Sequence, residues 1–221
     1  MNVLAVGATG KLGFRICAGL VRNGHHVRGL TRAGSPRAAE LKQAGVEVFQ
    51  GDLRDAASLD AATRGQNVVV STATAIMSSG AGNNFGAVDR DGHKALLAAA
   101  KKNGVGKFVF VSLSPLVPTI SPLIACKREV EQAVRASGLK WTILQPSYFM
   151  EIRFGPELGW DLHQGKGQYF GKGTARASTI SIEDVATCSV AAVTEAKSDN
   201  QDVPLGGPAA LSSLEIIALF E

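Results

Sequence analysis

Cysteine and histidine are scarce in this chain. Its 221 residues include three cysteines and four histidines. The cysteines Cys17, Cys126 and Cys188 are too far apart to form a metal-binding or redox motif. The histidines lack the paired spacing of zinc ligands. We therefore expect no metal centre.

Long apolar runs and a strong charge imbalance are also absent. No run approaches the roughly 20 residues of a membrane-spanning helix, and Met1 and Asn2 lead into a predicted strand rather than a signal peptide. The net charge is +4 and the pI about 9.1, but the basic residues are scattered among few aromatics. These features predict a cytoplasmic protein that binds neither membrane nor nucleic acid.

Strand and helix patterns alternate regularly along the chain. Strands are predicted near residues 2–6, 26–30, 47–50, 67–71, 107–111, 141–145 and 202–205. Helical patterns lie near residues 11–22, 38–44, 59–64, 88–103, 125–137 and 182–195. The strands lack polar alternation, which is typical of strands covered by helices on both faces. We expect an α/β fold, a Rossmann-type doubly wound parallel sheet, in one domain of residues 1–221.

A glycine-rich turn follows the first predicted strand directly. It reads Gly7-Ala8-Thr9-Gly10-Lys11-Leu12-Gly13 and leads into the first predicted helix. Three glycines at this spacing permit a tight turn, close approach of a pyrophosphate and close packing of helix on strand. The free N–H groups at the helix start favour an anion. The sequence predicts a dinucleotide site that uses Gly7, Thr9, Gly10, Lys11, Leu12 and Gly13; the alternative is a simple turn.

Arg32 follows the second predicted strand, where the chain should reach the adenosine ribose. An acidic residue there would favour NAD(H). An arginine can instead pair with a 2′-phosphate, so the sequence predicts NADP(H), with NAD(H) as the less favoured cofactor. Ser35 and Arg37 are predicted helpers. The alternative is a solvated arginine at a strand end.

Two stretches lack a clear periodicity. Residues 74–86, rich in Ser and Gly, are predicted to form a loop that is either a lid or a plain connector. Residues 148–178 are predicted to be irregular and are the candidate substrate-binding segment. Their aromatic residues either form a substrate wall or pack a minor core.

Together these motifs resemble the atypical short-chain dehydrogenases/reductases, specifically the NmrA-like and isoflavone-reductase-like NAD(P)H-binding proteins. The resemblance extends along nearly the whole chain. It is carried by the glycine turn, Arg32, Gly51-Asp52-Leu53, Lys127-Arg128-Glu129-Val130-Glu131, and Gln145-Pro146 with Phe149.

The resemblance implies positions along the cofactor. Asp52 and Leu53 would border the adenine, and Thr72 and Ala73 would line the dinucleotide beyond the fourth strand. Residues 146–149, which include Pro146 and Phe149, would flank the nicotinamide. Each has a structural alternative: Asp52 as a helix cap, Thr72 at a strand end and Pro146 as a strand terminator.

The family's proton donor is missing. Short-chain dehydrogenases use a tyrosine four residues before a lysine, because hydride delivery leaves an alkoxide that needs a proton. Lys127 is present, but Leu123 occupies the tyrosine position. The resemblance implies that Lys127 holds the nicotinamide ribose hydroxyls; the alternative is a solvated lysine. Ser114 lies near the family's substrate-polarising serine, and Tyr148 or Lys127 is predicted to supply the proton.

These expectations favour an NADPH-dependent oxidoreductase that transfers hydride to a quinone, an enone or a similar small electrophile. The missing tyrosine supports an alternative, a non-catalytic NADP(H)-binding redox sensor or assembly factor that acts through a protein partner. A small-molecule substrate is the predicted partner. A protein partner and a homodimer remain open.

Overall fold

Seven parallel strands form the main sheet. The computed structural model describes residues 1–76, 82–117, 120–161, 164–169 and 171–220. The strand order is β3-β2-β1-β4-β5-β6-β9, and all neighbouring strands are parallel. The strands are β1 (Asn2–Val6), β2 (His26–Thr31), β3 (Glu47–Gln50), β4 (Val68–Ser71), β5 (Lys107–Val111), β6 (Lys140–Pro146) and β9 (Gln201–Leu205). The prediction of a Rossmann-type doubly wound parallel sheet is confirmed.

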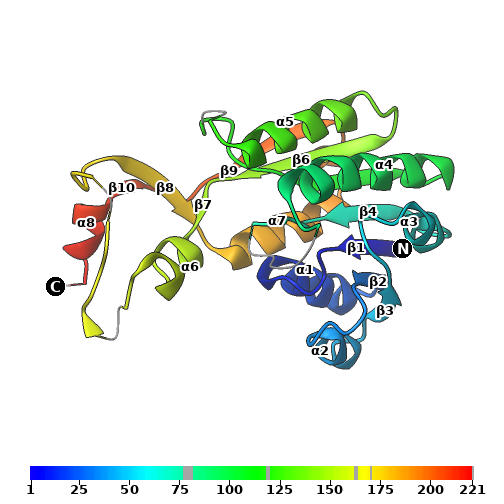
Figure 1. Cartoon of the computed structure of the whole chain (residues 1–221), viewed down its shortest axis with the longest axis horizontal. Helices are drawn as coiled ribbons and strands as arrows, with labels where there is room; N and C mark the ends of the chain where they lie inside the picture. The colour runs from blue at the N-terminus through cyan, green and yellow to red at the C-terminus, as the bar shows by residue number, and fades with distance from the viewer. Residues whose placement is uncertain (77–81, 118–119, 162–163, 170, 221) are drawn as a thin grey trace.

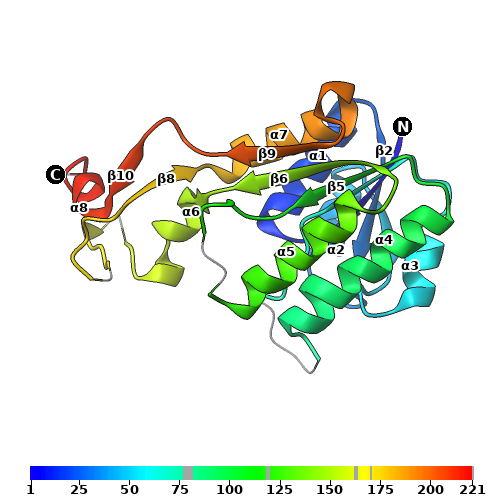
Figure 2. The same ribbon diagram turned by 90° about the horizontal axis from the view of Figure 1, so that it is seen from above.

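Helices cover both faces of this sheet (Figures 1 and 2). On β5, Val109 and Val111 pack toward one face, whereas Phe108 and Phe110 pack toward the other. The first face carries α1 (Lys11–Arg22), α2 (Ala38–Gln43) and α7 (Ile182–Thr194). The second carries α3 (Ala56–Thr63), α4 (His93–Lys102) and α5 (Pro122–Arg135). Alternate residues of each strand therefore serve two cores, which explains the continuous apolar runs.

The connection from β4 to α4 departs from the predicted single helix at 88–103. A π-helical segment, η1 (Phe85–Gly92), precedes α4, and the Asn84 side chain accepts a hydrogen bond from the Ala87 N–H at its start. π-Helical turns are rare and often lie at functional sites. Residues 77–81 of the predicted lid or connector lie outside the described residues.

A second, three-stranded sheet builds a small lobe beside the main body (Figure 1). Its order is β10-β8-β7. The lobe contains β7 (Tyr148–Phe149), α6 (Met150–Arg153), η2 (Pro156–Leu158), β8 (Arg176–Ile180), β10 (Ala210–Ser212) and α8 (Ser213–Ile217). The prediction that 148–178 is irregular was therefore wrong. β7 has only two residues and pairs with a strand about 30 residues away, so no local periodicity announces it.

The ends of several helices agree with their capping patterns. The Ser212 hydroxyl and the Glu215 carboxylate form the expected capping box of α8. Ser181 caps α7, and a short helix, η4 (Ala196–Ser198), links α7 to β9.

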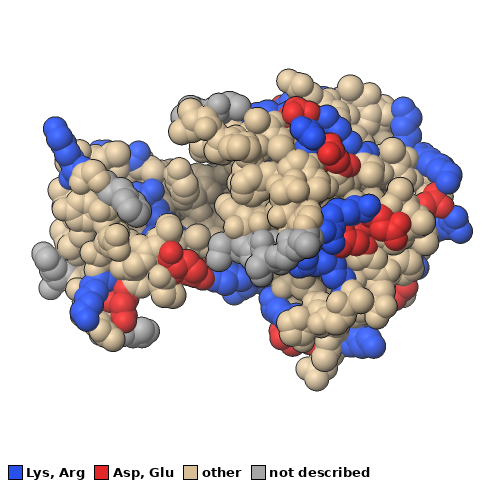
Figure 3. Space-filling model, in the orientation of Figure 1, with Lys and Arg blue, Asp and Glu red and all other residues tan. Residues whose placement is uncertain are grey.

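Among the described residues, no helix is both long and apolar enough to cross a membrane. On the face shown in Figure 3, Lys and Arg are interspersed with Asp and Glu. The cytoplasmic location stays a prediction.

Candidate functional site

A cavity of about 670 Å³ lies at the carboxyl ends of the main strands. The strand order reverses between β1 and β4, and ligands of open α/β sheets bind at this switch point. Most of the predicted cofactor residues line the cavity: Gly7, Thr9, Gly10, Lys11, Leu12, Gly13, Arg32, Asp52, Leu53, Thr72, Ala73, Lys127, Pro146 and Phe149. Arg37, Ser114 and Tyr148 do not belong to its lining. The functional roles of all these residues stay predictions.

The glycine turn forms one end of the cavity from bare backbone. Gly7 has a φ of 86°, a left-handed conformation that glycine adopts without strain. A Cβ on Gly13 would lie 2.1 Å from the Gly7 carbonyl oxygen, so the packing of α1 on the turn requires glycine there. Gly10 begins α1 without any side-chain cap. The N–H groups of the first helical turn are therefore left to a ligand.

Three arginines lie at or near the side of the cavity where the sequence predicts the adenosine: Arg32 belongs to the lining, and Arg37 and Arg54 contact residues of it. Arg32 is exposed, so the structure leaves its alternative as a solvated residue open. Arg37 donates a 2.9 Å hydrogen bond to the Thr9 carbonyl, which ties α2 to the glycine turn. Asp52 pairs with Arg54 at 2.7 Å, and this hydrogen bond lowers the pKa of the Asp52 carboxyl. Asp55, not Asp52, caps α3, so the helix-cap alternative for Asp52 was wrong.

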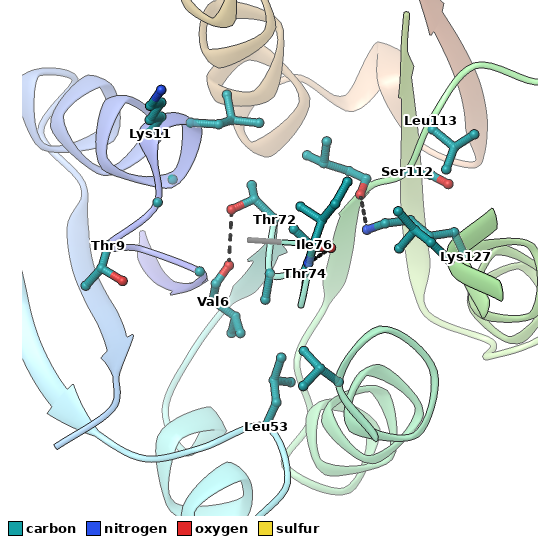
Figure 4. A pocket seen from close by; sticks show the side chains of 18 of the residues that line it. Val6, Thr9, Lys11, Leu53, Thr72, Thr74, Ile76, Ser112, Leu113 and Lys127 are labelled. Atoms are coloured by element: carbon teal, nitrogen blue, oxygen red, sulfur yellow. Dashed lines mark hydrogen bonds between the residues drawn. The ribbon is translucent and has the colours of Figure 1, made fainter. Parts of the chain in front are cut away.

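Lys127 reaches the opposite end of the cavity from α5 (Figure 4). Its Nζ donates to the Val111 carbonyl at 3.3 Å and lies 5.0 Å from the centre of the Phe110 ring. The Asp89 carboxylate is 3.7 Å away. The side chain is only 8% exposed, so the alternative of a solvated lysine was wrong. Burial is the largest influence and holds the pKa of Lys127 below its ordinary value, although the charges of Asp89 and Glu131 act in the opposite direction.

A buried carboxylate lies behind this end of the cavity. Glu131 is 3% exposed and accepts a 2.6 Å hydrogen bond from the Ser112 hydroxyl. Gln145 donates to the same carboxylate oxygen at 3.2 Å and Arg128 at 2.7 Å. Because the Ser112 hydroxyl proton is committed to Glu131, Ser112 can only accept hydrogen bonds from the cavity.

The free hydroxyl at this end belongs to Ser147. Its Oγ is buried and has no hydrogen-bond partner among the described residues, and Ser147 lines the cavity. The sequence had singled out Ser114 and Tyr148 instead. The Ser114 hydroxyl accepts from the Leu116 N–H at 3.3 Å, and Tyr148 is 55% exposed with its ring against Arg153. The sequence alone does not reveal that this hydroxyl is buried, because its burial depends on how the chain that follows Ser147 packs around it.

The small lobe closes the remaining side of the cavity. Phe149, Ile152 and Glu157 belong to the lining, and Glu157 accepts a 2.9 Å hydrogen bond from Lys11 across the cavity mouth. Other aromatics of residues 148–178 form a minor core: the rings of Phe154 and Trp160 contact edge to face at 5.2 Å. The minor-core alternative therefore holds for Phe154 and Trp160, and a substrate-binding role for this segment stays a prediction.

The residues present fit a nicotinamide dinucleotide. One end offers a glycine backbone and uncapped helical N–H groups for a pyrophosphate. The other end offers a buried ammonium and an unpartnered hydroxyl, on Lys127 and Ser147. Figure 4 shows Thr9 and Lys11 on one side, Ser112, Leu113 and Lys127 on the other, and Thr72 between them.

Comparison with known proteins decides the family. A family model described as NAD(P)H-binding matches residues 7–196. The chain belongs to this NAD(P)H-binding family. The resemblance seen in its motifs, and the prediction of a nicotinamide cofactor, are thereby confirmed.

Relatives of this NAD(P)H-binding protein have diverse names. The photosystem II assembly factor Ycf39 of Cyanophora paradoxa is 32% identical over 222 residues, which cover all of this chain and 68% of that protein. An NAD(P)H azoreductase of Xenophilus azovorans is 30% identical, over 98% of this chain and 71% of that one. The Escherichia coli NADPH-dependent quinone oxidoreductase QOR2, solved with NADPH, matches all of this chain and 74% of its own with a TM-score of 0.79. At 24% identity, this structural match shows a shared fold and nothing more.

Proposed function

We propose that this protein is an NADPH-dependent oxidoreductase that reduces a quinone, an enone or a similar small electrophile. The observation that carries the proposal is one continuous cavity, which joins an uncapped helix start at Gly10 to an apolar end with a buried ammonium. The apolar end is lined by Leu113, Leu123 and Ile152, which suit a flat, largely apolar substrate. The azoreductase relative, whose name indicates a reductase acting on an unsaturated electrophile, supports this class.

Each end of the cavity has a distinct task. The first turn of α1 and the glycine turn hold the pyrophosphate through backbone N–H groups. Arg32 pairs with the 2′-phosphate, which favours NADP(H) over NAD(H). Lys127 holds the nicotinamide ribose through the ammonium N–H that faces the cavity, while a second ammonium N–H donates to the Val111 carbonyl. The bound cofactor supplies the hydride.

The reaction also needs a proton for the reduced acceptor, and Leu123, which lines the cavity at the position of the family's tyrosine, cannot donate one. Ser147 and Lys127 are the polar donors that the structure places at this end of the lining. A reduced quinone oxygen is a far weaker base than an alkoxide and can take its proton from water. We therefore expect quinones to be reduced faster than simple ketones.

The test is NADPH absorbance loss with matched quinone and ketone substrates. General acid catalysis contributes about 10²–10⁴-fold, so quinone turnover should exceed ketone turnover by a margin of that order. Leu123→Tyr should raise ketone reduction, because the phenol would enter the cavity near Lys127. Leu116→Tyr is the matched control, since Leu116 is 90% exposed and outside the lining. Rapid ketone turnover by the unmodified protein would contradict the proposal.

A second candidate is a non-catalytic NADP(H)-binding sensor or assembly factor. Two observations favour it: Leu123 in place of a donor, and a relative named as a photosystem II assembly factor. Calorimetry separates the two functions. Tight NADPH binding with no turnover on any quinone, azo or enone acceptor would favour the sensor, and turnover would favour the reductase.

A further inference from the structure

Asp89 is a buried carboxylate that the proposed function does not use. It lies on the π-helical segment η1 and is 0% exposed. Its Oδ2 accepts a 2.9 Å hydrogen bond from the Ala75 N–H. Its Oδ1 has no hydrogen-bond partner among the described residues and lies 3.7 Å from the Lys127 Nζ, too far for a hydrogen bond. A buried carboxylate oxygen left without a hydrogen bond is costly, which indicates a role beyond holding the loop.

The groups around Lys127 leave Asp89 as its nearest counter-charge. On α4, His93 is fully buried; its Nδ1 must donate to the Val88 carbonyl, so its Nε2 accepts from the Ser71 hydroxyl. Burial lowers the pKa of His93 to about 3, so this ring is neutral. On α5, the Glu131 carboxylate is already engaged by Ser112, Gln145 and Arg128.

We propose that Asp89 is a positioning residue that keeps the buried Lys127 ammonium charged and directed at the nicotinamide end of the cavity. An isolated ammonium between the Phe110 ring and the strand ends would lose its proton readily, since burial favours the neutral form. An opposite charge within 4–6 Å favours the charged form. At 3.7 Å the Asp89 carboxylate attracts the Lys127 ammonium but is too far away to accept a hydrogen bond from it. The ammonium proton that faces the cavity therefore stays available to a ligand. Asp89 thereby acts through Lys127 and needs no contact with substrate.

The direct test is the titration of Lys127, followed by NMR in protein with ¹⁵N- and ¹³C-labelled lysine and without cofactor. Lys127→Met identifies the signal. In Asp89→Asn the amide oxygen can still accept from the Ala75 N–H, so the variant keeps that hydrogen bond while an uncharged NH₂ group replaces the oxygen that faces Lys127. We expect the pKa of Lys127 to fall by about one to three units. Asp91→Asn is the matched control, two residues away on the same segment, exposed and paired with Arg90; it should leave the titration unchanged.

A second readout uses NADP⁺ binding by calorimetry at pH 6 and pH 8. In Asp89→Asn, affinity should fall about tenfold at pH 8, as for the loss of a hydrogen bond to a charged group, and recover at pH 6, where Lys127 regains its proton. A purely structural role for Asp89 would weaken binding equally at both pH values, which would overturn the proposal. So would an unchanged Lys127 titration in Asp89→Asn.

The unmodified protein provides a test if Asp89→Asn does not fold. Lys127 should then carry its proton at pH 7 in the absence of cofactor, and a neutral Lys127 at that pH would overturn the proposal. The inference rests on the proposed function only in assigning Lys127 to the cofactor. Its charge state is measured without turnover, so a protein that binds NADP⁺ but reduces nothing would reject the enzyme and leave the Asp89–Lys127 pairing standing.

Discussion

The two ends of the cavity are built in different ways. The end proposed to bind the phosphates comes from one short stretch, residues 7–13, whose glycines leave the backbone open and permit close packing. The end proposed to bind the nicotinamide collects Ser112, Leu123, Lys127 and Ser147 from different segments, with Asp89 behind them. A site made of backbone is visible in the local sequence. A site made of side chains from distant segments becomes visible only when the fold brings them together.

The largest expected effect is at the phosphate end. Gly13→Ala would place a Cβ 2.1 Å from the Gly7 carbonyl oxygen, so the turn or the helix must move. We expect a loss of about 1–3 kcal/mol in the free energy of unfolding, measured by urea denaturation. Cofactor affinity should be lost as well, because the shifted turn no longer presents its N–H groups. Gly106→Ala is the control, since its Cβ would meet its nearest atom at 3.5 Å. Normal NADPH binding by Gly13→Ala would show that close packing at this turn is not required.

The next effect concerns the choice of cofactor. Arg32→Asp should weaken NADPH binding by about 10- to 150-fold, because charge-assisted hydrogen bonds of about 1.5–3 kcal/mol are replaced by repulsion. NADH binding should not fall. Arg22→Asp, in the last turn of α1, serves as the control. Equal affinity of the unmodified protein for both cofactors, measured by calorimetry, would reject the role of Arg32.

A smaller effect is expected from Ser147, the serine with a buried hydroxyl in the cavity lining. Ser147→Ala removes a buried hydroxyl that has no hydrogen-bond partner in the part of the chain that the structure describes, so the thermal midpoint should not fall. We expect kcat/KM for a quinone to drop about 2- to 10-fold, the value of one net hydrogen bond. Ser114→Ala is the natural comparison, because its hydroxyl bonds to the Leu116 N–H. If Ser114→Ala loses more turnover than Ser147→Ala, the sequence-based choice of Ser114 is the better one.

The smallest effect is expected at the ion pair between Lys11, next to the glycine turn, and Glu157 of the small lobe. Glu157→Gln breaks the exposed ion pair with Lys11 and removes a negative charge beside the pyrophosphate site. NADPH affinity should rise by less than about fivefold, because exposed pairs are worth about 0.2–1 kcal/mol, and the gain should shrink in high salt. Glu183→Gln is the control: it breaks a comparable ion pair with Arg15, which lies on α1 like Lys11, and neither residue lines the cavity. An equal gain in both variants would point to net charge alone.

The main sheet was predictable because its signals are local. Six of its seven strands contain the predicted segments, and β4 begins at Val68, one residue after the predicted start. The capping pattern predicted at Ser212 is also confirmed. Helix starts were less accurate: α5 begins at Pro122, three residues before the predicted range, because Ser121 caps it. Of the site, the glycine turn, Lys127 and the stretch 146–149 that contains Ser147 were expected near the cavity, whereas the buried hydroxyl of Ser147 and the counter-charge on Asp89 were not. Glu131 could have been found, since it lies four residues after Lys127 and three before the buried Val134 on one face of α5.

The small lobe is joined to the main body at three places: Ser147 between β6 and β7, Ser181 between β8 and α7, and residues 206–209 between β9 and β10. The Ser147 N–H also bonds to the Leu205 carbonyl, so the first and third connections are tied together. A rotation of the lobe about these joints would move Phe149 and Ile152 while the glycine turn stayed fixed in the main sheet. In the proposed function, such a rotation would move the residues that face the acceptor and leave those that hold the cofactor in place, so that one cofactor site would suit acceptors of different width.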